Sequence, residues 1–225
     1  MSNVLKKRLI IFDVDGTLVD SENDVFLGIN HVLTTNVGIE VSREEFRKMA
    51  GLTLEQTFEG LLPEDKKELS KDFTAQYRQY YIDERHCLDT TKLFEGVADI
   101  IDSFKKQGFI LAVASSKAKR ALDPILEHLG LAEQFDLILA TGATNVKHKP
   151  DPEIIYNILE ELNVAPNDAV MVGDTRADIL AGKNAGIDTI AITYGYEERE
   201  KLIASEPTYM IDEFYEIGTL ITYRG

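Results

Sequence analysis

Two aspartates, Asp13 and Asp15, directly follow an apolar run at residues 9–12, and a glycine comes after them. The run is typical of a short strand that is buried on both faces, and the two carboxylates leave its end on the same side of the pleat. Like charges this close repel each other unless a cation or a proton lies between them. A purely structural role would not favour such a pair, so we expect a functional site at this strand end.

Other polar residues follow further apolar segments that we expect to be strands. These segments are residues 109–115, 135–141, 168–174 and 188–193. Helical stretches separate them, and this alternation predicts βαβ units with a parallel sheet covered on both faces. Ligands of such sheets bind at the carboxyl ends of the strands, and there the chain carries Ser115, Ser116, Lys149, Asp174 and Asp178.

Phosphoryl transfer is the chemistry that this set of residues indicates. Several carboxylates that converge on one point need a hard divalent cation, which we expect to be Mg²⁺ held by oxygen ligands. The Ser115 hydroxyl and the backbone N–H groups before the next helix would form an anion site. Lys149 would add a point charge that suits phosphate. A metal, an anion site and a carboxylate nucleophile together indicate transfer through an aspartyl-phosphate.

The chain is expected to form two modules. Residues 21–87 show helical periodicity without a strand pattern, including one long helical segment at 63–85. This insert separates the first strand from the others. We therefore predict an α/β fold in which a Rossmann-like parallel-sheet core, residues 1–19 and 89–225, carries an inserted all-helical cap domain at residues 20–88.

Four motifs in order resemble the haloacid dehalogenase superfamily, in its phosphoglycolate-phosphatase-like branch with a helical cap. They are D-x-D-G-T at 13–17, a hydroxyl residue after a strand at Ser115, the lysine of K-P-x-P at 149–152, and G-D-x-x-x-D at 173–178. The resemblance implies a Mg²⁺-dependent phosphatase that hydrolyses a small soluble phosphomonoester. Many phosphoglycolate relatives have Thr-Asn where this chain has Ser115-Ser116. Serine keeps the hydroxyl, so this departure leaves the chemistry intact and the substrate open.

The resemblance also implies a role for each motif residue. Asp13 would be the nucleophile, and Asp15 would be the general acid and base. Asp13, the backbone carbonyl of Asp15 and Asp174 would hold Mg²⁺, and Asp178 would support the metal site. The residues that bind the transferring phosphoryl group or the rest of the substrate would be Ser115, Lys149, Thr17 and Ser116.

In the cap, residues 46–53 are the candidate for substrate specificity. This stretch ends a predicted helix and carries Arg47 and Lys48 in an otherwise acidic chain. Arg47 would bind an anionic or hydroxylated group of the substrate beyond the phosphoryl group. The alternative is that the two cations only favour the C-terminus of their helix through its dipole.

Composition and charge exclude several classes of function. The formal net charge of −15 argues against nucleic acid as a partner, and no apolar run is long enough to span a bilayer. Cys87 is the only cysteine, so we expect no intrachain disulfide and a cytoplasmic location. The expected partner is a small phosphorylated metabolite. A phosphoglucomutase-like phosphotransferase and a pyrophosphatase remain alternatives, and the sequence leaves the oligomeric state open. A non-catalytic relative would have no reason to keep the costly acid cluster.

Overall fold

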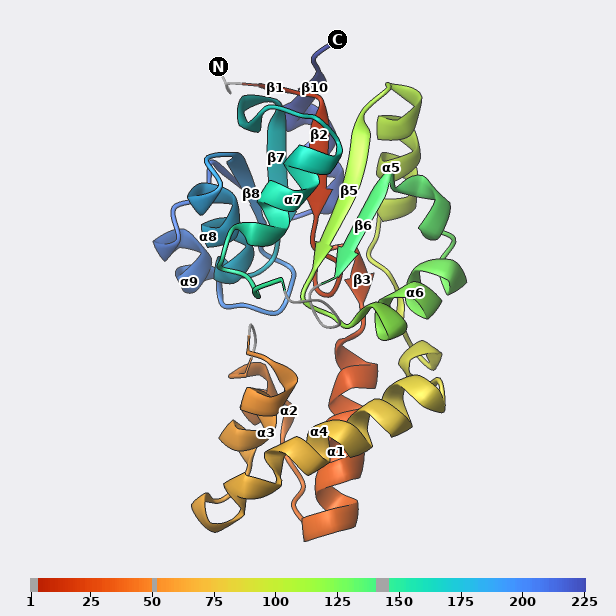
Figure 1. Ribbon diagram of the computed structural model, residues 1–225, viewed down its shortest axis with the longest axis vertical. Coiled ribbons are helices and arrows are strands. Elements are labelled where there is room, and N and C mark those ends of the chain that lie inside the picture. The colour runs from red at the N-terminus through yellow and green to blue at the C-terminus, as the bar shows by residue number, and fades with distance from the viewer. Residues whose placement is uncertain (1–3, 50–51, 141–145) are drawn as a thin grey trace. The chain divides into compact units, whose positions relative to one another are not determined.

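The computed structural model describes residues 4–49, 52–140 and 146–225. The chain divides into two compact units, residues 1–20 with 92–225, and residues 21–91. In the described part of the chain the first unit is an α/β core, and the second is built from helices (Figure 1). Both observed boundaries lie slightly later in the chain than the expected ones.

A six-stranded parallel sheet forms the centre of the α/β core. Its strand order is β6-β5-β2-β7-β8-β9, and every neighbouring pair is parallel. The prediction of a Rossmann-like parallel sheet is therefore confirmed, with β9 as a strand that the sequence did not reveal. The strands are β2 (Leu9–Phe12), β5 (Ile110–Ser115), β6 (Leu137–Ala140), β7 (Ala169–Gly173), β8 (Asp188–Ile192) and β9 (Tyr209–Ile211).

Two small sheets complete the core. Strand β1 (Leu5–Lys7) pairs in parallel with β10 (Ile221–Tyr223), which joins the two ends of the chain. Strand β3 (Val19–Asp20) pairs antiparallel with β4 (Lys92–Leu93). This second ribbon ties together the two segments between which the helical unit is inserted.

Helices cover both faces of the central sheet. Helices α7 and α8 lie over one face of the sheet (Figure 1), and their apolar residues share one core cluster with Leu9 and Ile11 of β2. On the other face, Phe12 contacts Phe135 and Phe214, since neighbouring residues of a strand point to opposite faces. The helices of the core are α5 (Val97–Lys106), α6 (Lys119–His128), α7 (Glu153–Glu161), α8 (Arg176–Asn184), α9 (Arg199–Ala204) and α10 (Ile217–Leu220).

The helical unit has its own aromatic core. The Phe58 ring meets Phe73 and Tyr77 edge to face, and Tyr77 stacks on Tyr81 with ring centroids 4.8 Å apart. No helix in the described ranges has the length and apolar character to cross a membrane. The helices of this unit are α1 (Glu22–Val37), α2 (Arg43–Arg47), α3 (Leu54–Leu61) and α4 (Ser70–Arg78).

The segment predicted to be helical at 63–85 is helical from Glu64 to Asp83, but it is not one uniform α-helix. A 3₁₀-helix (Glu64–Leu69) leads into α4, and a π-helical turn (Gln79–Asp83) follows it. A π turn is wider than an α turn, so Tyr80, three positions after Tyr77, moves off the face of Tyr77, whereas Tyr81, four positions after it, stays on that face. Tyr81 is therefore buried beside Tyr77, whereas Tyr80 stacks against His31.

Candidate active site

Asp13 lies at the carboxyl end of the central strand of the sheet. Strand β2 is fully buried between β5 and β7, and the Asp13 N–H donates to the Val172 carbonyl oxygen of β7 at 2.9 Å. The backbone of Asp13 is therefore held by the sheet, and the exposed fraction of its side chain is only 10%. Because the sheet is parallel, the ends of β5, β7 and β8 lie at this same edge.

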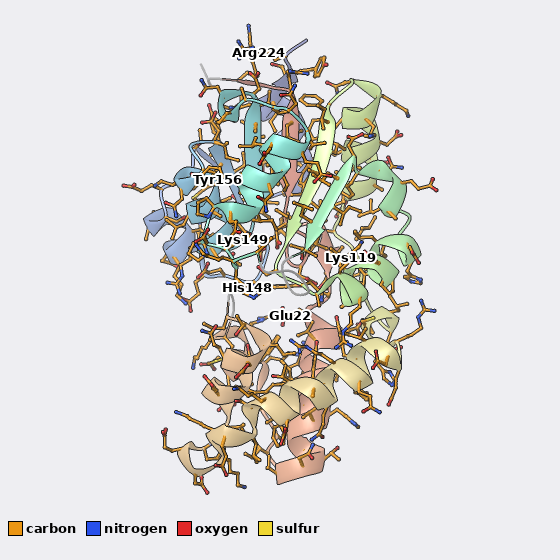
Figure 2. All side chains as sticks on the ribbon, in the orientation of Figure 1. Glu22, Lys119, His148, Lys149, Tyr156 and Arg224 are labelled. Carbon is orange, nitrogen blue, oxygen red and sulfur yellow. The ribbon has the colours of Figure 1, made fainter. Side chains whose placement is uncertain are left out.

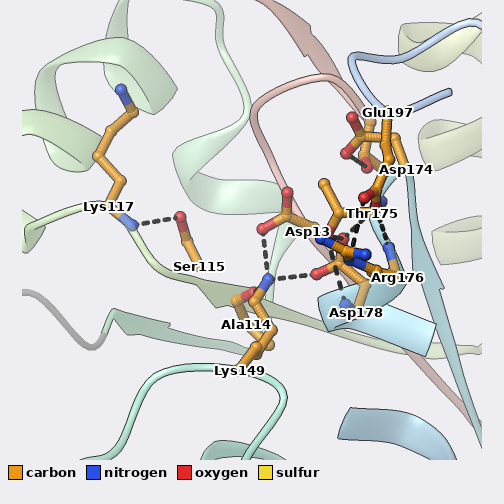
Figure 3. A network of polar contacts seen from close by, with 11 residues as sticks. Asp13, Ala114, Ser115, Lys117, Lys149, Asp174, Thr175, Arg176, Asp178 and Glu197 are labelled. Carbon is orange, nitrogen blue, oxygen red and sulfur yellow. Dashed lines mark hydrogen bonds and ion pairs between the residues drawn. The ribbon is translucent and has the colours of Figure 1, made fainter. Parts of the chain in front are cut away.

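Lys149 brings its ammonium group into the middle of this edge. Its Nζ donates to Asp13 Oδ1 at 2.7 Å, to Asp178 Oδ1 at 2.5 Å and to the Ala114 carbonyl oxygen at 2.8 Å (Figure 3). All three donor positions of the ammonium are thus used. The neighbouring Lys147 is exposed and pairs with Asp151 instead, so Lys149 is the lysine of this segment that reaches the acids.

Three buried carboxylates converge beside this lysine. Asp13, Asp174 and Asp178 each offer one oxygen, and these oxygens all lie within 4.8 Å of one another. When all are ionised, three carboxylates face one ammonium, so the buried site keeps an excess of negative charge. Oxygen donors in this number and spacing fit a hard divalent cation. The donor set therefore suits a divalent metal ion.

Hydrogen bonds fix the two acids that follow β7. Thr17 donates its hydroxyl to Asp174 Oδ1 at 3.0 Å, and the Tyr196 N–H donates to Asp174 Oδ2 at 2.8 Å. Asp178 Oδ2 accepts from the N–H and the hydroxyl of Thr175 at 3.0 and 2.6 Å, in a capping box at the start of α8. With Lys149 on its other oxygen, Asp178 is the most fully engaged of the three carboxylates.

Burial and repulsion between carboxylates raise the pKa of Asp13 and of Asp174. Burial raises the pKa of Asp13 to about 7; the Lys149 ammonium opposes this shift, and the Asp178 carboxylate adds to it. The pKa of Asp174 is raised well above its usual range by burial and by the charges of Asp178 and Asp13. Burial alone would lower the pKa of Lys149, but the Asp13 and Asp178 carboxylates together raise it. The lysine stays charged, and a cation bound beside Asp13 and Asp174 would stabilise their ionised forms.

Ser115 and Ser116 lie at the carboxyl end of the neighbouring strand. Ser115 ends β5, is buried, and accepts a hydrogen bond from the Lys117 N–H at 3.1 Å (Figure 3). The next helix, α6, begins at Lys119. Ser116 is exposed, directly after the strand. The hydroxyl of Ser115 and the turn after it lie at the same sheet edge as Asp13.

Asp15 and Thr17 lie in the tight turn after β2. The Leu18 and Val19 N–H groups both donate to the Val14 carbonyl oxygen at 2.9 Å, and Gly16 adopts a left-handed conformation with φ +81°. This turn leaves the Asp15 side chain partly exposed, with Oδ1 3.3 Å from Lys117 Nζ. The Thr17 hydroxyl, by contrast, is buried on Asp174.

Arg47 belongs to the helical unit and not to the α/β core. Its Nε and one terminal nitrogen donate to the two carboxylate oxygens of Glu22 at 2.9 and 3.0 Å, which is a bidentate ion pair. Lys48 pairs with Glu44 on the same helix. Residues 50 and 51 of the specificity stretch lie outside the described residues. A substrate contact by Arg47 stays a prediction.

Sequence reasoning missed several residues of this site. Lys117 reaches Asp15, Thr175 caps α8 onto Asp178, and the segment Tyr194–Glu197 contacts Asp174 and Arg176. Thr175 and Asp178 have capping-box spacing, which is a readable signal. The segment after β8 also follows a strand end of the same sheet, but nothing in its residue types indicates acid chemistry.

A family model for haloacid dehalogenase-like hydrolases matches residues 10–192, which include the whole acid cluster. The chain belongs to this family. Phosphoglycolate phosphatase 1 of Pseudomonas aeruginosa is 32% identical over 216 residues, 93% of this chain and 78% of that protein. Pyrophosphatase PpaX of Bacillus cereus (strain Q1) is 30% identical over 219 residues, 97% of this chain and 98% of that protein.

A solved structure shares the fold of nearly the whole chain. The crystal structure of a predicted phosphoglycolate phosphatase from Haemophilus somnus aligns with a TM-score of 0.85 and 28% identity. The alignment covers 95% of this chain and 97% of that one. The likeness thus extends over both the α/β core and the helical unit, and the expected family is confirmed over most of the chain.

Proposed function

We propose that this hydrolase is a Mg²⁺-dependent phosphatase that acts on a small phosphomonoester through an aspartyl-phosphate at Asp13. The observation that carries the proposal is the contact of one buried ammonium, Lys149 Nζ, with both Asp13 and Asp178, beside a third carboxylate on Asp174. A nucleophilic carboxylate needs an anionic substrate brought next to it against charge repulsion. A buried cation and an acid cluster that suits a divalent metal meet that need.

Asp13 is the proposed nucleophile because its carboxylate lies at the end of a rigid central strand, in contact with Lys149. The residues that would hold Mg²⁺ are Asp13, Asp174 and the Asp15 backbone carbonyl, with Asp178 in support. When bound, Mg²⁺ would neutralise charge on the transferring phosphoryl group and orient it for in-line attack. Lys149 holds Asp13 in place and offers a charge that suits phosphate oxygens.

Asp15 is the proposed general acid and base. It follows the nucleophile by two residues, and its side chain is partly exposed. A group that exchanges protons with a leaving group and with water must be accessible in this way. In the first step Asp15 would protonate the leaving oxygen, and in the second it would take a proton from the attacking water. Ser115 and Ser116 lie at the next strand end as the proposed phosphoryl and substrate contacts. Thr17 is a further proposed substrate contact, and its hydroxyl donates to Asp174 Oδ1.

The proposed substrate is a small phosphorylated metabolite of the phosphoglycolate type. The support is the similarity over nearly the whole chain to phosphoglycolate phosphatases. Pyrophosphate is the second candidate, because the similarity to pyrophosphatases covers as much of the chain. Both substrates place a phosphoryl group on a small anionic leaving group, and both would use the same acid cluster.

The test is phosphate release from a panel of phosphomonoesters and pyrophosphate, with Asp13→Asn as the decisive variant. An amide is a poor nucleophile, so turnover should fall by more than ~10³-fold while the variant stays folded. A phosphoryl group trapped on residue 13 of the wild type, located by mass spectrometry after rapid acid quenching, would identify the intermediate. Asp102→Asn, at an exposed acid paired with Lys106, is the matched control. Substantial Asp13→Asn activity without deamidation would exclude the proposed nucleophile.

A further inference from the structure

The segment Tyr194–Glu197, which follows β8, contacts both loops that carry the acids. The Tyr194 hydroxyl donates to the Thr17 carbonyl oxygen at 2.7 Å, in the turn after the proposed nucleophile. The Tyr196 N–H donates to Asp174 Oδ2 at 2.8 Å, after β7. These residues lie far from Thr17 in the sequence. The segment connects the turn after β2 with the loop after β7, which the sheet alone would not join. We call it the clamp segment.

The clamp segment fixes the orientation of the Asp174 carboxylate. The Tyr196 N–H holds Oδ2, and the Thr17 hydroxyl holds Oδ1, so both oxygens have a protein donor. Each carboxylate oxygen can accept more than one hydrogen bond or metal contact, so both stay able to bind a cation. Tyr194 affects Asp174 indirectly. It holds the backbone of Thr17, whose hydroxyl donates to Asp174.

Two glycines allow this close approach. A Cβ atom on Gly195 would lie 2.2 Å from Asp174 Cβ, and a Cβ atom on Gly16 would lie 2.2 Å from Asp174 Oδ2. Neither distance is compatible with a side chain at these positions. Asp174 is therefore enclosed between the backbone of the turn after β2 and the backbone of the clamp segment, and its side chain is fully buried.

Glu197 connects the clamp segment to α8, the helix that carries Asp178. It is buried, and its Oε2 accepts from the Arg176 N–H at 2.5 Å while Oε1 lies 3.2 Å from Arg176 Nε (Figure 3). Arg176 is the first residue of α8, so Glu197 satisfies an N–H at the helix start that has no partner within the helix. One segment thus supports Asp174 directly and Asp178 through the position of α8.

We propose that the clamp segment is a positioning element that sets the affinity of the acid cluster for its divalent cation. The proposal rests on the proposed function, because it takes the cluster to be a metal site. Residues that orient the ligands of a metal commonly change its affinity without touching it. Burial and the nearby Asp174 charge raise the pKa of Tyr194, so its hydroxyl keeps the proton that it donates to Thr17.

Tyr194→Phe tests the proposal, because it removes one hydroxyl and keeps the ring that packs against Phe94. Mg²⁺ and Mn²⁺ binding are measured by titration calorimetry without substrate. We expect the dissociation constant to rise by about 3- to 10-fold, the effect of one lost hydrogen bond. The Mg²⁺ concentration for half-maximal activity should rise by the same factor, while kcat at saturating Mg²⁺ changes less than about twofold.

Tyr156→Phe is the matched control. The Tyr156 hydroxyl donates to the Asn184 carbonyl oxygen at 3.0 Å from α7 (Figure 2), so this variant loses the same kind of hydrogen bond away from the acids. Glu197→Gln, which weakens the ion pair with Arg176, is the second test variant. Weaker metal binding in either clamp variant, with Tyr156→Phe unchanged, would support the positioning role.

The outcomes separate this proposal from the proposed function. Wild-type metal affinity in both folded clamp variants would overturn the positioning role and leave the phosphatase proposal intact. A fall in kcat at saturating metal with unchanged metal affinity would also overturn it, because the segment would then act on the reaction and not on the metal. If the wild-type protein bound neither cation, the metal site itself would be refuted, and the positioning role with it.

Discussion

The Lys149 ammonium lies 2.7 Å from Asp13 Oδ1, and the two side chains are almost entirely buried. This is an ion pair inside the protein and not at its surface, and the Asp178 carboxylate shares the same ammonium at 2.5 Å. Breaking a buried pair by removing one partner leaves an uncompensated charge, which costs more than the pair itself contributes. Lys149 is therefore important for stability as well as for the proposed chemistry.

Lys149→Met should destabilise the metal-free protein by about 3–5 kcal/mol at about pH 8, because Asp13 and Asp178 lose their counter-charge. Near pH 5 the loss should be smaller, since Asp13 can then take a proton. The measurement is the free energy of unfolding from urea titrations at both pH values. Lys147→Met, at the exposed lysine that pairs with Asp151, should change it by less than about 1 kcal/mol. Equal, small effects of the two substitutions at about pH 8 would contradict the assignment.

Metal binding should stabilise the protein more at high pH than at low pH. Burial raises the pKa of Asp13 to about 7 from an ordinary value of 3.8, and the pKa of Asp174 moves in the same direction. A raised acid binds more protons in the folded than in the unfolded chain, so its contribution to stability falls as pH rises between these two values. A divalent cation needs the ionised carboxylates and opposes that loss.

The measurement is the melting temperature with and without saturating Mg²⁺ at about pH 5 and about pH 8, at constant ionic strength. We expect the Mg²⁺-dependent rise in melting temperature to be clearly larger at the higher pH. The apparent dissociation constant for Mg²⁺ should increase by up to about tenfold for each pH unit below 7. Asp13→Asn should reduce this pH dependence. A Mg²⁺-dependent rise that is the same at both pH values would show that the cation does not bind at the acids.

The strands and their ends were the part of the fold that local sequence could reveal. A buried parallel strand is a continuous apolar run, and the observed β5 and β7 begin one residue inside the expected segments. In a parallel sheet the strand ends share one edge, so the amino-acid sequence alone was enough to group Asp13, Ser115 and Asp174. Strand β9 escaped because it is a short edge strand, with only partial burial of Tyr209 and Met210.

The parts of the site that could not be predicted depend on contacts between distant segments. The Tyr194 hydroxyl meets a residue 177 positions away, and no local pattern encodes such a meeting. Lys117 and Lys119 are similar in sequence context, yet the exposed side-chain fraction is 12% for the first and 59% for the second. Lys117 lies in the turn before α6 and reaches Asp15, whereas Lys119 is the first residue of the helix and pairs with Asp123.

Lys117→Met should slow turnover of substrates with poor leaving groups and spare p-nitrophenyl phosphate. Lys117 Nζ lies 3.3 Å from Asp15 Oδ1, so its loss should let the proposed general acid move from its position. General acid help matters least for a stable leaving group. We expect kcat for an alkyl phosphate to fall by about 10- to 100-fold, part of the ~10²–10⁴ that general acid catalysis contributes. Steady-state kinetics with both substrates measure the difference.

Two controls separate a role through Asp15 from a general effect. Lys119→Met changes an exposed lysine that pairs with Asp123 (Figure 2) and should leave both substrates unaffected. In an Asp15→Ala background, Lys117→Met should have little further effect on the alkyl phosphate, because residues that act together are not additive. Full additivity of the two substitutions would mean that Lys117 contacts the substrate itself or supports the fold.

Arg47→Ala should raise KM for the natural substrate and leave p-nitrophenyl phosphate nearly unchanged. Glu22 holds the Arg47 guanidinium through two hydrogen bonds, which fixes its direction while its side chain stays 59% exposed. An oriented, accessible guanidinium suits an anionic or hydroxylated group beyond the phosphoryl group. Loss of one charged hydrogen bond should raise KM by about 10- to 100-fold, as measured with the best substrate of the metabolite panel.

Glu22→Gln tests whether Arg47 serves only to form the ion pair with Glu22 or also binds the substrate. If Arg47 only ties α2 to α1, then Glu22→Gln and Arg47→Ala should both cost less than about 1 kcal/mol of stability and leave KM unchanged for every substrate. If Arg47 binds the substrate, Glu22→Gln should raise KM less than Arg47→Ala does, because the guanidinium remains but loses its fixed direction.

Arg43, which also approaches Glu22 at 3.6 Å, provides the control: Arg43→Ala should leave KM unchanged. A KM effect of Arg43→Ala as large as that of Arg47→Ala would assign the effect to the charge of this helix and not to a specific contact.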